Sequence, residues 1–476
     1  MRSLGNFVLL VSFAIVAGAG LWVGHQLQPT SREMAARYRF THQNLLDETG
    51  VYEARINTMN QNPNCLPIHV STQAKISFFY LHCSEAAIKR DTQALKITPD
   101  FSVDERLARR VHFWHKIYAL WSKDEFVLHV AEYPEVVLEM ARSNEPETSN
   151  RNIIEIKKAL QAKEIRYAEI LRSLHRKSLK RDFSYANLDP AERRVYDLMS
   201  HIPDRAKFSK AAGEIRVQRG QREFIKKGIE MSSRYLPTIE KSFEELGIPK
   251  DLAKIAFVES SFNINALSKV GASGVYQFMP FAAREYLIIN SGIDERRDPI
   301  KSGLAAAKLF KANYGIVPHW PLAVTAYNHG AYGVRRAAQS VHSTELADLV
   351  ENYDGRGFGF ASKNFYSEFL GILLTLSNKY DHFIDLDEDT PMQFEAYKLP
   401  SWQSISQIKK KFGVNESEIL AYNPDLMVHF VRRNGHLPKG FVIKLPVSIE
   451  REKVADEKDS LRAPRKSMVS GQAEAT

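Results

Sequence analysis

The sequence predicts a mainly α-helical protein built from several modules. Residues 109–121 and 252–262 carry apolar side chains at the three- and four-residue spacing of a buried helix face. Asp189-Pro190 and Asp298-Pro299 each place a helix-capping residue before a proline at the first helical position. With 476 residues, of which 44% are hydrophobic, the chain is long enough for about three domains with sizeable cores.

The first residues predict export from the cytoplasm. Arg2 precedes an uncharged run over residues 3–24. Ala17-Gly-Ala19 fits a signal-peptidase site, but a run of about twenty apolar residues is also long enough to span a bilayer. We therefore expect residues 1–28 to be a signal peptide or an N-terminal membrane anchor, with the body of the protein in the periplasm or cell envelope. No cysteine lies near this run, which disfavours a lipid anchor.

Cys65 and Cys83 are the two cysteines of a chain that we expect to be exported. An even pair in such a compartment favours a structural disulfide over two free, buried thiols. Both lie far from the motifs described below, which disfavours a thiol nucleophile.

Residues 29–210 predict a helical accessory region with little chemistry of its own. Val111, Trp114, Tyr118 and Trp121 share one helix face, a pattern typical of core packing. Residues 152–180 predict a long, charged helix.

One residue on the second apolar helix needs an explanation. Leu252, Ile255, Ala256, Glu259 and Phe262 share a face, so a carboxyl group projects along the apolar stripe. An ionised glutamate is costly in a protein core. The helix alone leaves two interpretations open, a buried and paired structural glutamate or a general acid with a raised pKa.

Two later segments favour the general acid. They are Ser268-Lys-Val-Gly-Ala-Ser-Gly-Val-Tyr-Gln-Phe-Met-Pro280 and Ala326-Tyr-Asn-His-Gly330. Together with Glu259-Ser260, in this order and spacing, they resemble the lytic transglycosylase (SLT) family over roughly residues 215–370. The resemblance implies a lysozyme-like helical catalytic domain, at residues 211–390. It also implies cleavage of the β-1,4 bond between N-acetylmuramic acid and N-acetylglucosamine in peptidoglycan.

The resemblance assigns a role to each motif position. An amide side chain suits the N-acetyl and hydroxyl groups of an amino sugar, and a thioether or an aromatic ring suits the apolar face of a pyranose. The catalytic acid falls on Glu259, and the residues expected to bind substrate are Ser268, Gln277, Met279, Tyr327 and Asn328.

The sequence departs from the family at one place. Many relatives carry Glu-Thr-Arg-x-Tyr after the Tyr-Asn motif, whereas Ala361-Ser-Lys-Asn-Phe365 stands here. The second acidic residue is therefore missing, and Tyr366 is expected to take the aromatic role at the substrate.

The expected mechanism uses the Glu259 carboxyl group twice. It first donates a proton to the glycosidic oxygen, then accepts the proton of the muramic C6 hydroxyl, which closes a 1,6-anhydro ring. Two alternatives stay open. A hydrolytic muramidase would need a second acid, for which Asp294, Glu295 and Asp298 are candidates, and a non-catalytic scaffold would bind the wall without turnover.

Residues 391–448 resemble a LysM module, a βααβ fold that binds glycans containing N-acetylglucosamine. The resemblance rests on residues 404–415, 419–424 and 437–446, and it points to the membrane-bound lytic murein transglycosylase D type. The opening at residues 399–404 departs from the common Gly-Asp-Thr-Leu, so a small packing domain without a ligand remains an alternative. The mixed-charge tail, residues 449–476, is expected to be disordered.

The formal net charge of +9 predicts an acidic partner, either the stem-peptide carboxylates of peptidoglycan or an anionic membrane surface. No recognition motif accompanies this charge, which disfavours nucleic acid. The 15 histidines include no His-Glu-x-x-His pattern and two cysteines cannot form a structural zinc site alone, so we expect no metal and no cofactor.

Overall fold

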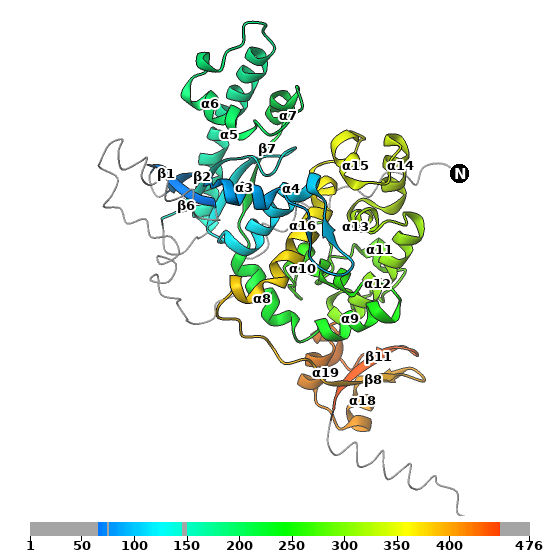
Figure 1. The fold of residues 1–476 in the computed structure, drawn as a ribbon. Coiled ribbons are helices and arrows are strands. Elements are labelled where there is room, and N and C mark those ends of the chain that lie inside the picture. The colour runs from blue at the N-terminus through cyan, green and yellow to red at the C-terminus, as the bar shows by residue number, and fades with distance from the viewer. Residues whose placement is uncertain (1–64, 74–75, 145–149, 448–476) are drawn as a thin grey trace, which may run out of the picture.

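The computed structural model describes residues 65–73, 76–144 and 150–447 (Figure 1). Helices predominate in these ranges, so the mainly α fold class is confirmed. The expected signal peptide or anchor and the expected C-terminal tail lie outside the described residues. Among the described helices, none combines the length and the apolar character needed to cross a bilayer.

The accessory region contains the expected helices, but at its centre lies an antiparallel sheet of five strands, in the order β1-β2-β6-β5-β7, that the sequence did not predict. Both faces of the sheet are covered: Phe126 and Leu128 of β5 point into one core, and Val127 points into the other. A strand buried on both faces lacks the alternation of polar and apolar residues that reveals a strand in sequence. The strands are β1 Cys65–Gln73, β2 Ile76–Cys83, β5 Glu125–Val130, β6 Val137–Ser143 and β7 Ile215–Arg219.

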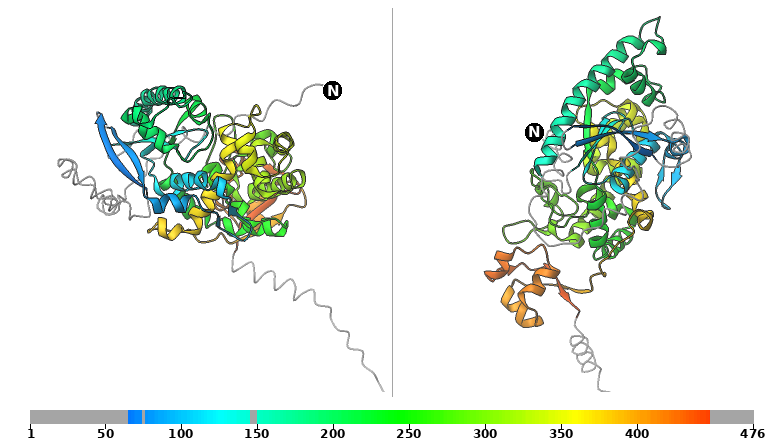
Figure 2. Two further views of the ribbon diagram at one scale, coloured as in Figure 1. Left: turned by 45° about the horizontal axis from the view of Figure 1, so that its top comes forward. Right: turned by 90° about the vertical axis from the view of Figure 1, so that its left-hand side faces the viewer.

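Three helices cover one face of this sheet (Figure 2). They are α5 Asn150–Ser178, α6 Pro190–Leu198 and α7 Lys207–Gly213. Helix α6 begins at the predicted site, where Asp189 caps the first turn and Pro190 follows. The remaining short elements of this region are α3 Glu85–Asp91, β3 Leu95–Lys96, β4 Ser102–Val103 and the 3₁₀ turn η3 Tyr185–Asn187.

The other face of the sheet packs on α4 Glu105–His115 and the π-helical turn η2 Lys116–Leu120. Val111, Trp114, Tyr118 and Trp121 are all buried, as their spacing predicted. Their core is continuous with that of residues 211–390, the expected catalytic domain, which is called the catalytic region below. The two are joined because α4 lies along α16 Phe360–Ser377. The indole of Trp114 donates a 3.0 Å hydrogen bond to Asn364 on α16. One of the two cores beside the sheet is therefore shared with the residues after position 210, whereas the other ends at Ile215.

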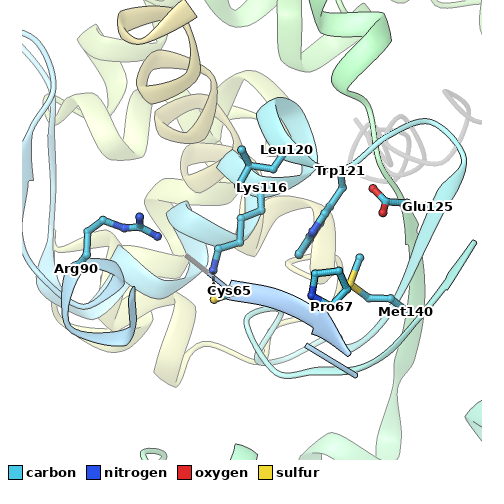
Figure 3. Close-up of a pocket in the computed structure, with 8 residues that line it drawn as sticks. All are labelled: Cys65, Pro67, Arg90, Lys116, Leu120, Trp121, Glu125 and Met140. Atoms are coloured by element: carbon cyan, nitrogen blue, oxygen red, sulfur yellow. Dashed lines mark hydrogen bonds between the residues drawn. The ribbon is translucent and has the colours of Figure 1, made fainter. Parts of the chain in front are cut away.

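A disulfide joins Cys65 and Cys83, which face each other across β1 and β2. Figure 3 shows the cavity beside it, which at 20 Å³ has room for about one water molecule. The ammonium group of Lys116 lies 3.5 Å from the Cys65 sulfur and 2.6 Å from a carboxylate oxygen of Asp91. The two cysteines are thus paired, as the sequence predicts.

The catalytic region is a bundle of helices around a buried core. One of its helices, α12, begins where Asp298-Pro299 predicts. Asp298 accepts hydrogen bonds from the first turn of α12, and α13 begins at Trp320. The elements are α8 Arg222–Ser232, α9 Leu236–Glu245, η4 Lys250–Lys254, α10 Ile255–Ser260, α11 Pro280–Ala283, η5 Glu295–Arg297, α12 Pro299–Ile316, α13 Trp320–His329, α14 Ala331–Val341, α15 Leu346–Asn352, α16 and α17 Lys379–His382.

The C-terminal module is a small unit whose first and last long strands, β8 Phe394–Lys398 and β11 Val442–Pro446, pair antiparallel. Between them lie α18 Ile405–Phe412, α19 Glu416–Tyr422 and a third, short helix, α20 Val428–Arg432. Two-residue strands, β9 Gln403–Ser404 and β10 His436–Leu437, also pair. This is the βααβ order that the sequence suggests, with one helical turn added.

The module is docked on the catalytic region through a buried ionic contact. Lys444, 3% exposed at its side chain, pairs with Asp298 at the start of α12. Lys301 pairs with Asp425 of the module at 2.7 Å. Ile293 of the catalytic region completes the apolar core of the module. The C-terminal module is therefore an integral part of the folded body.

Replacing Lys444 with methionine should destabilise the protein by roughly 3 kcal/mol, because Asp298 would remain buried without its cation. Burial lowers the pKa of Lys444 to about 7, so chemical unfolding at pH 6, where Lys444 is charged, would measure this loss. The matched control is Lys439→Met, at an exposed lysine of the same module. An equal, small effect of the two substitutions would show that the ionic contact does not hold the module in place.

Candidate active site

Glu259 lies on the last turn of α10, on the apolar face that the sequence predicts. Leu252, Ile255, Ala256 and Phe262 are fully buried, and Glu259 is 8% exposed. The segment is a 3₁₀ turn, η4, followed by the short α10, rather than one continuous helix. Helix α10 ends at Ser261, which adopts the left-handed conformation. The chain therefore leaves the helix two residues after Glu259.

The Glu259 carboxyl group has neither a cation nor a hydrogen-bond partner among the residues that the structure describes. Burial raises its pKa to about 8, and Glu368 adds to the increase. A buried structural glutamate would need a partner. The environment therefore matches the general-acid interpretation of Glu259, because the group holds its proton at neutral pH.

Glu368 is the site residue that the sequence reasoning missed. It lies on α16, and burial raises its pKa to about 8 as well. Both carboxyl groups act electrostatically on the hydroxyl of Tyr118, which comes from the accessory region. The available signal was the one that identified Glu259, a carboxylate inside an otherwise apolar helix.

Tyr327 is held by two parallel rings. Phe310 lies at 4.9 Å and Phe365 at 6.2 Å between ring centroids, with interplanar angles of 21° and 6°. The Tyr327 hydroxyl donates a 2.9 Å hydrogen bond to the backbone oxygen of Tyr276. Burial raises the pKa of Tyr327 well above its usual value, and Glu259 contributes to the increase. The tyrosine is thus a neutral, fixed group near the acid.

The loop after α10 is tied to that helix by Ser260, whose hydroxyl donates a 2.9 Å hydrogen bond to the backbone oxygen of Val275. Gly274 has a φ of +75°, and a Cβ there would lie 1.8 Å from the backbone oxygen of Arg296, so glycine is required. Gln277 has a φ of 47° and donates from its amide to the Gly274 oxygen at 2.8 Å. The Gln277 side chain therefore stabilises the loop that carries it.

Three other residues were expected to bind substrate; they lie in the loop, at the start of α11 and on α13. Ser268 accepts a 2.8 Å hydrogen bond from the backbone of Ala272, within the same loop. Met279 caps α11 and is half-buried. Asn328 accepts a 3.3 Å hydrogen bond from Ser362 on α16. Tyr366, the last residue expected to bind substrate, does not lie beside Tyr327 or Glu259.

Tyr366 is buried beside Phe369, and the charge that acts on its hydroxyl is that of Asp104. The aromatic ring that faces Tyr327 belongs to the preceding residue, Phe365. A one-residue shift along a helix turns the side chain by about 100°, which explains the difference.

The three candidate acids for hydrolysis are engaged elsewhere. Asp294 forms a 2.8 Å ion pair with Arg296. Glu295 pairs with Lys301 at 3.0 Å, and Asp298 binds Lys444. All three carboxylates stabilise the segment between the Gln277 loop and α12, together with its contact to the C-terminal module. Among the described residues, no cluster of histidine, cysteine and acidic side chains could hold a metal ion.

The fold and this site belong to a known class of domain. Residues 238–349 match the family described as the Transglycosylase SLT domain, and this range contains Glu259, the loop after α10 and Tyr327. The chain therefore contains a transglycosylase SLT domain. The resemblance to the SLT family that the motifs indicated is confirmed for residues 238–349.

Two curated proteins are similar to parts of the chain. The Membrane-bound lytic murein transglycosylase D of Escherichia coli (strain K12) is 26% identical over 192 residues, which are 40% of this chain and 42% of that protein. A Putative tributyltin chloride resistance protein of Alteromonas sp. (strain M-1) is 32% identical over 109 residues, 22% of this chain and 53% of that protein. The matches thus span about half of each relative or less.

Among solved structures, an inactive mutant of the lytic transglycosylase Slt from Pseudomonas aeruginosa aligns with 43% of this chain and 33% of its own chain. Its sequence identity to this chain is 17% and the TM-score is 0.27.

Proposed function

We propose that the protein is a peptidoglycan lytic transglycosylase that cleaves the β-1,4 bond between N-acetylmuramic acid and N-acetylglucosamine. One observation carries the proposal: Glu259 is a buried, unpaired carboxyl group within the range that matches the SLT domain, and its pKa is raised to about 8. A general acid must be protonated when the substrate binds, and this environment keeps the proton in place.

The reaction proceeds in two proton transfers at Glu259. Glu259 first donates its proton to the glycosidic oxygen as the bond to C1 breaks towards an oxocarbenium-like state. The resulting carboxylate then accepts the proton of the muramic C6 hydroxyl, whose oxygen bonds to C1. The products are a strand with a free N-acetylglucosamine C4 hydroxyl and a 1,6-anhydro-N-acetylmuramic acid end. Glu259 regains its proton, so no water is consumed.

Glu368 is the second carboxyl group that a hydrolytic mechanism at Glu259 could use. Hydrolysis with two carboxyl groups needs one of them ionised, as nucleophile or as base for water. Burial raises the pKa of Glu368 to about 8, so it is protonated at neutral pH. Ionising either group raises the proton affinity of the other, as in other carboxyl pairs. A protonated Glu368 cannot activate water, which favours attack by the tethered C6 hydroxyl.

The products test this proposal. Muropeptides released from purified sacculi should end in 1,6-anhydro-N-acetylmuramic acid and should carry no oxygen from ¹⁸O-labelled water at C1. Mass spectrometry distinguishes the two outcomes, because anhydro ends are one water lighter than hydrolysed ends. Mainly reducing ends that contain the label would identify a muramidase and would make Glu368 its second acid. Absence of any cleavage would favour the non-catalytic scaffold.

We further propose that the C-terminal module is a LysM-type wall-binding unit and that the protein acts in the periplasm or cell envelope, anchored or released there through residues 1–28. The βααβ order of the module and the apolar N-terminal run support this placement. The E. coli relative is named as a membrane-bound lytic murein transglycosylase, which agrees with this placement. The net charge of +9 suits the acidic stem peptides of the wall or an anionic membrane.

A further inference from the structure

A second hollow lies on the catalytic region, at the opposite end of α13 from Tyr327. It has a volume of 600 Å³ and is formed by the end of α9, the adjoining turn at residues 246–250, the end of α12 and the first residue of α13. Asp100, from the turn before β4, closes one side of it. Trp320 and Tyr327 are seven positions apart, roughly 10 Å along the helix. The lining of this groove includes neither Glu259 nor Tyr327, so the groove is separate from the Glu259 site.

A stacked aromatic pair forms one wall of this groove. The rings of Tyr314 and Trp320 lie 4.3 Å apart between centroids, with an angle of 29° between their planes. Tyr314 is 37% exposed, so part of its ring faces solvent. The stack fixes the orientation of that ring before any ligand arrives. A fixed, half-exposed aromatic ring offers apolar contact at small entropic cost to a flat ligand with an apolar face.

Charged groups of both signs surround the aromatic pair. Lys250 and Glu244 form a 3.0 Å ion pair in which each side chain is about half exposed. The ammonium group of Lys311 donates a 3.0 Å hydrogen bond to the backbone oxygen of Leu246. Asp100 supplies a further exposed carboxylate. The groove therefore combines an apolar lining with hydrogen-bond donors and acceptors at its rim, as sites for small polar ligands do.

This combination favours a carbohydrate. A pyranose has an apolar face of C–H groups, which packs on an aromatic ring, and equatorial hydroxyl and N-acetyl groups, which need both donors and acceptors at the ring's edge. We propose that the groove around Tyr314 and Trp320 is a second glycan-binding site, which holds N-acetylglucosamine units of a strand away from the bond being cleaved. The choice of amino sugar rests on the proposed function.

The fluorine NMR signal of a labelled Trp320 reports on this groove separately from the Glu259 site. The full chain with Glu259→Gln, labelled with 5-fluorotryptophan, is titrated with tetra-N-acetylchitotetraose, and the Trp320 signal is assigned with Trp320→Phe. We expect the Trp320 signal to shift and saturate. Adding Tyr314→Ala should weaken binding at Trp320 by about tenfold, because the ring that carries the apolar contact is removed. Tyr380→Ala is the matched control, at a tyrosine that is 69% exposed outside the groove.

Several outcomes would overturn the proposal. They are a Trp320 signal that does not move with the oligosaccharide, a shift unchanged by Tyr314→Ala, or a shift produced by a free stem peptide but not by the sugar. The result is distinguishable from a failure of the proposed function. Product analysis of the parent protein tests turnover at Glu259, whereas the Trp320 signal reports binding in a protein that need not turn over.

Discussion

Replacing Glu259 with glutamine should lower the rate of glycan cleavage by about 10³-fold or more, while glycan binding stays near that of the parent. Glutamine keeps the shape of the side chain but can neither donate nor accept the catalytic proton, a contribution that is typically worth about 10²–10⁴. Release of muropeptides from sacculi measures cleavage, and co-sedimentation with sacculi measures binding. Glu285→Gln, at an exposed glutamate beyond the Gln277 loop, is the control. A Glu259→Gln rate within tenfold of the parent would exclude Glu259 as the acid.

The same substitution should stabilise the protein at alkaline pH. The pKa of Glu259 is 4.5 in its ordinary state and about 8 in the fold, so the native state binds more protons than the unfolded state between these values. Stability therefore falls as pH rises through that window. Glutamine removes this loss, and the variant should gain up to about 4 kcal/mol at pH 8 but little at pH 4. Equal gains at both pH values would contradict the raised pKa.

Replacing Glu368 with glutamine should move the alkaline limit of activity to lower pH. Glu259 must be protonated to act, and Glu368 is the second cause of its raised pKa, after burial. Without that carboxyl group, Glu259 loses its proton at a lower pH, whereas the rate near pH 5 should stay within a few-fold of the parent. Rates from pH 4 to pH 9 measure the shift.

Two results would overturn this role for Glu368. An unchanged pH profile would show that the two carboxyl groups are not coupled. Loss of activity at every pH, in a variant that still unfolds cooperatively, would make Glu368 a catalytic acid in its own right. Asp at this position provides a further comparison, because Glu368→Asp keeps a carboxyl group and should retain part of the alkaline activity.

The local features of this protein could be read from the sequence because they depend on neighbours along the chain. The apolar face around Glu259 follows from helical spacing, and each of its members is buried. The starts of α6 and α12 follow from an aspartate before a proline, which caps a helix wherever it occurs. The motif spacing from Glu259 to Tyr327 likewise identified the class of domain that the family match confirms.

What the sequence did not determine depends on contacts between distant residues. Strand β5 is buried on both faces, so its sequence hides the sheet. Asp298 has no visible partner until the fold brings Lys444 to it from 146 residues away. Glu368 lies 109 positions after Glu259, and only the packing of α16 beside α10 makes its charge act on the acid. Burial and charge sum over all neighbours in space, so the tertiary structure alone decided which carboxyl groups hold protons and which form ion pairs.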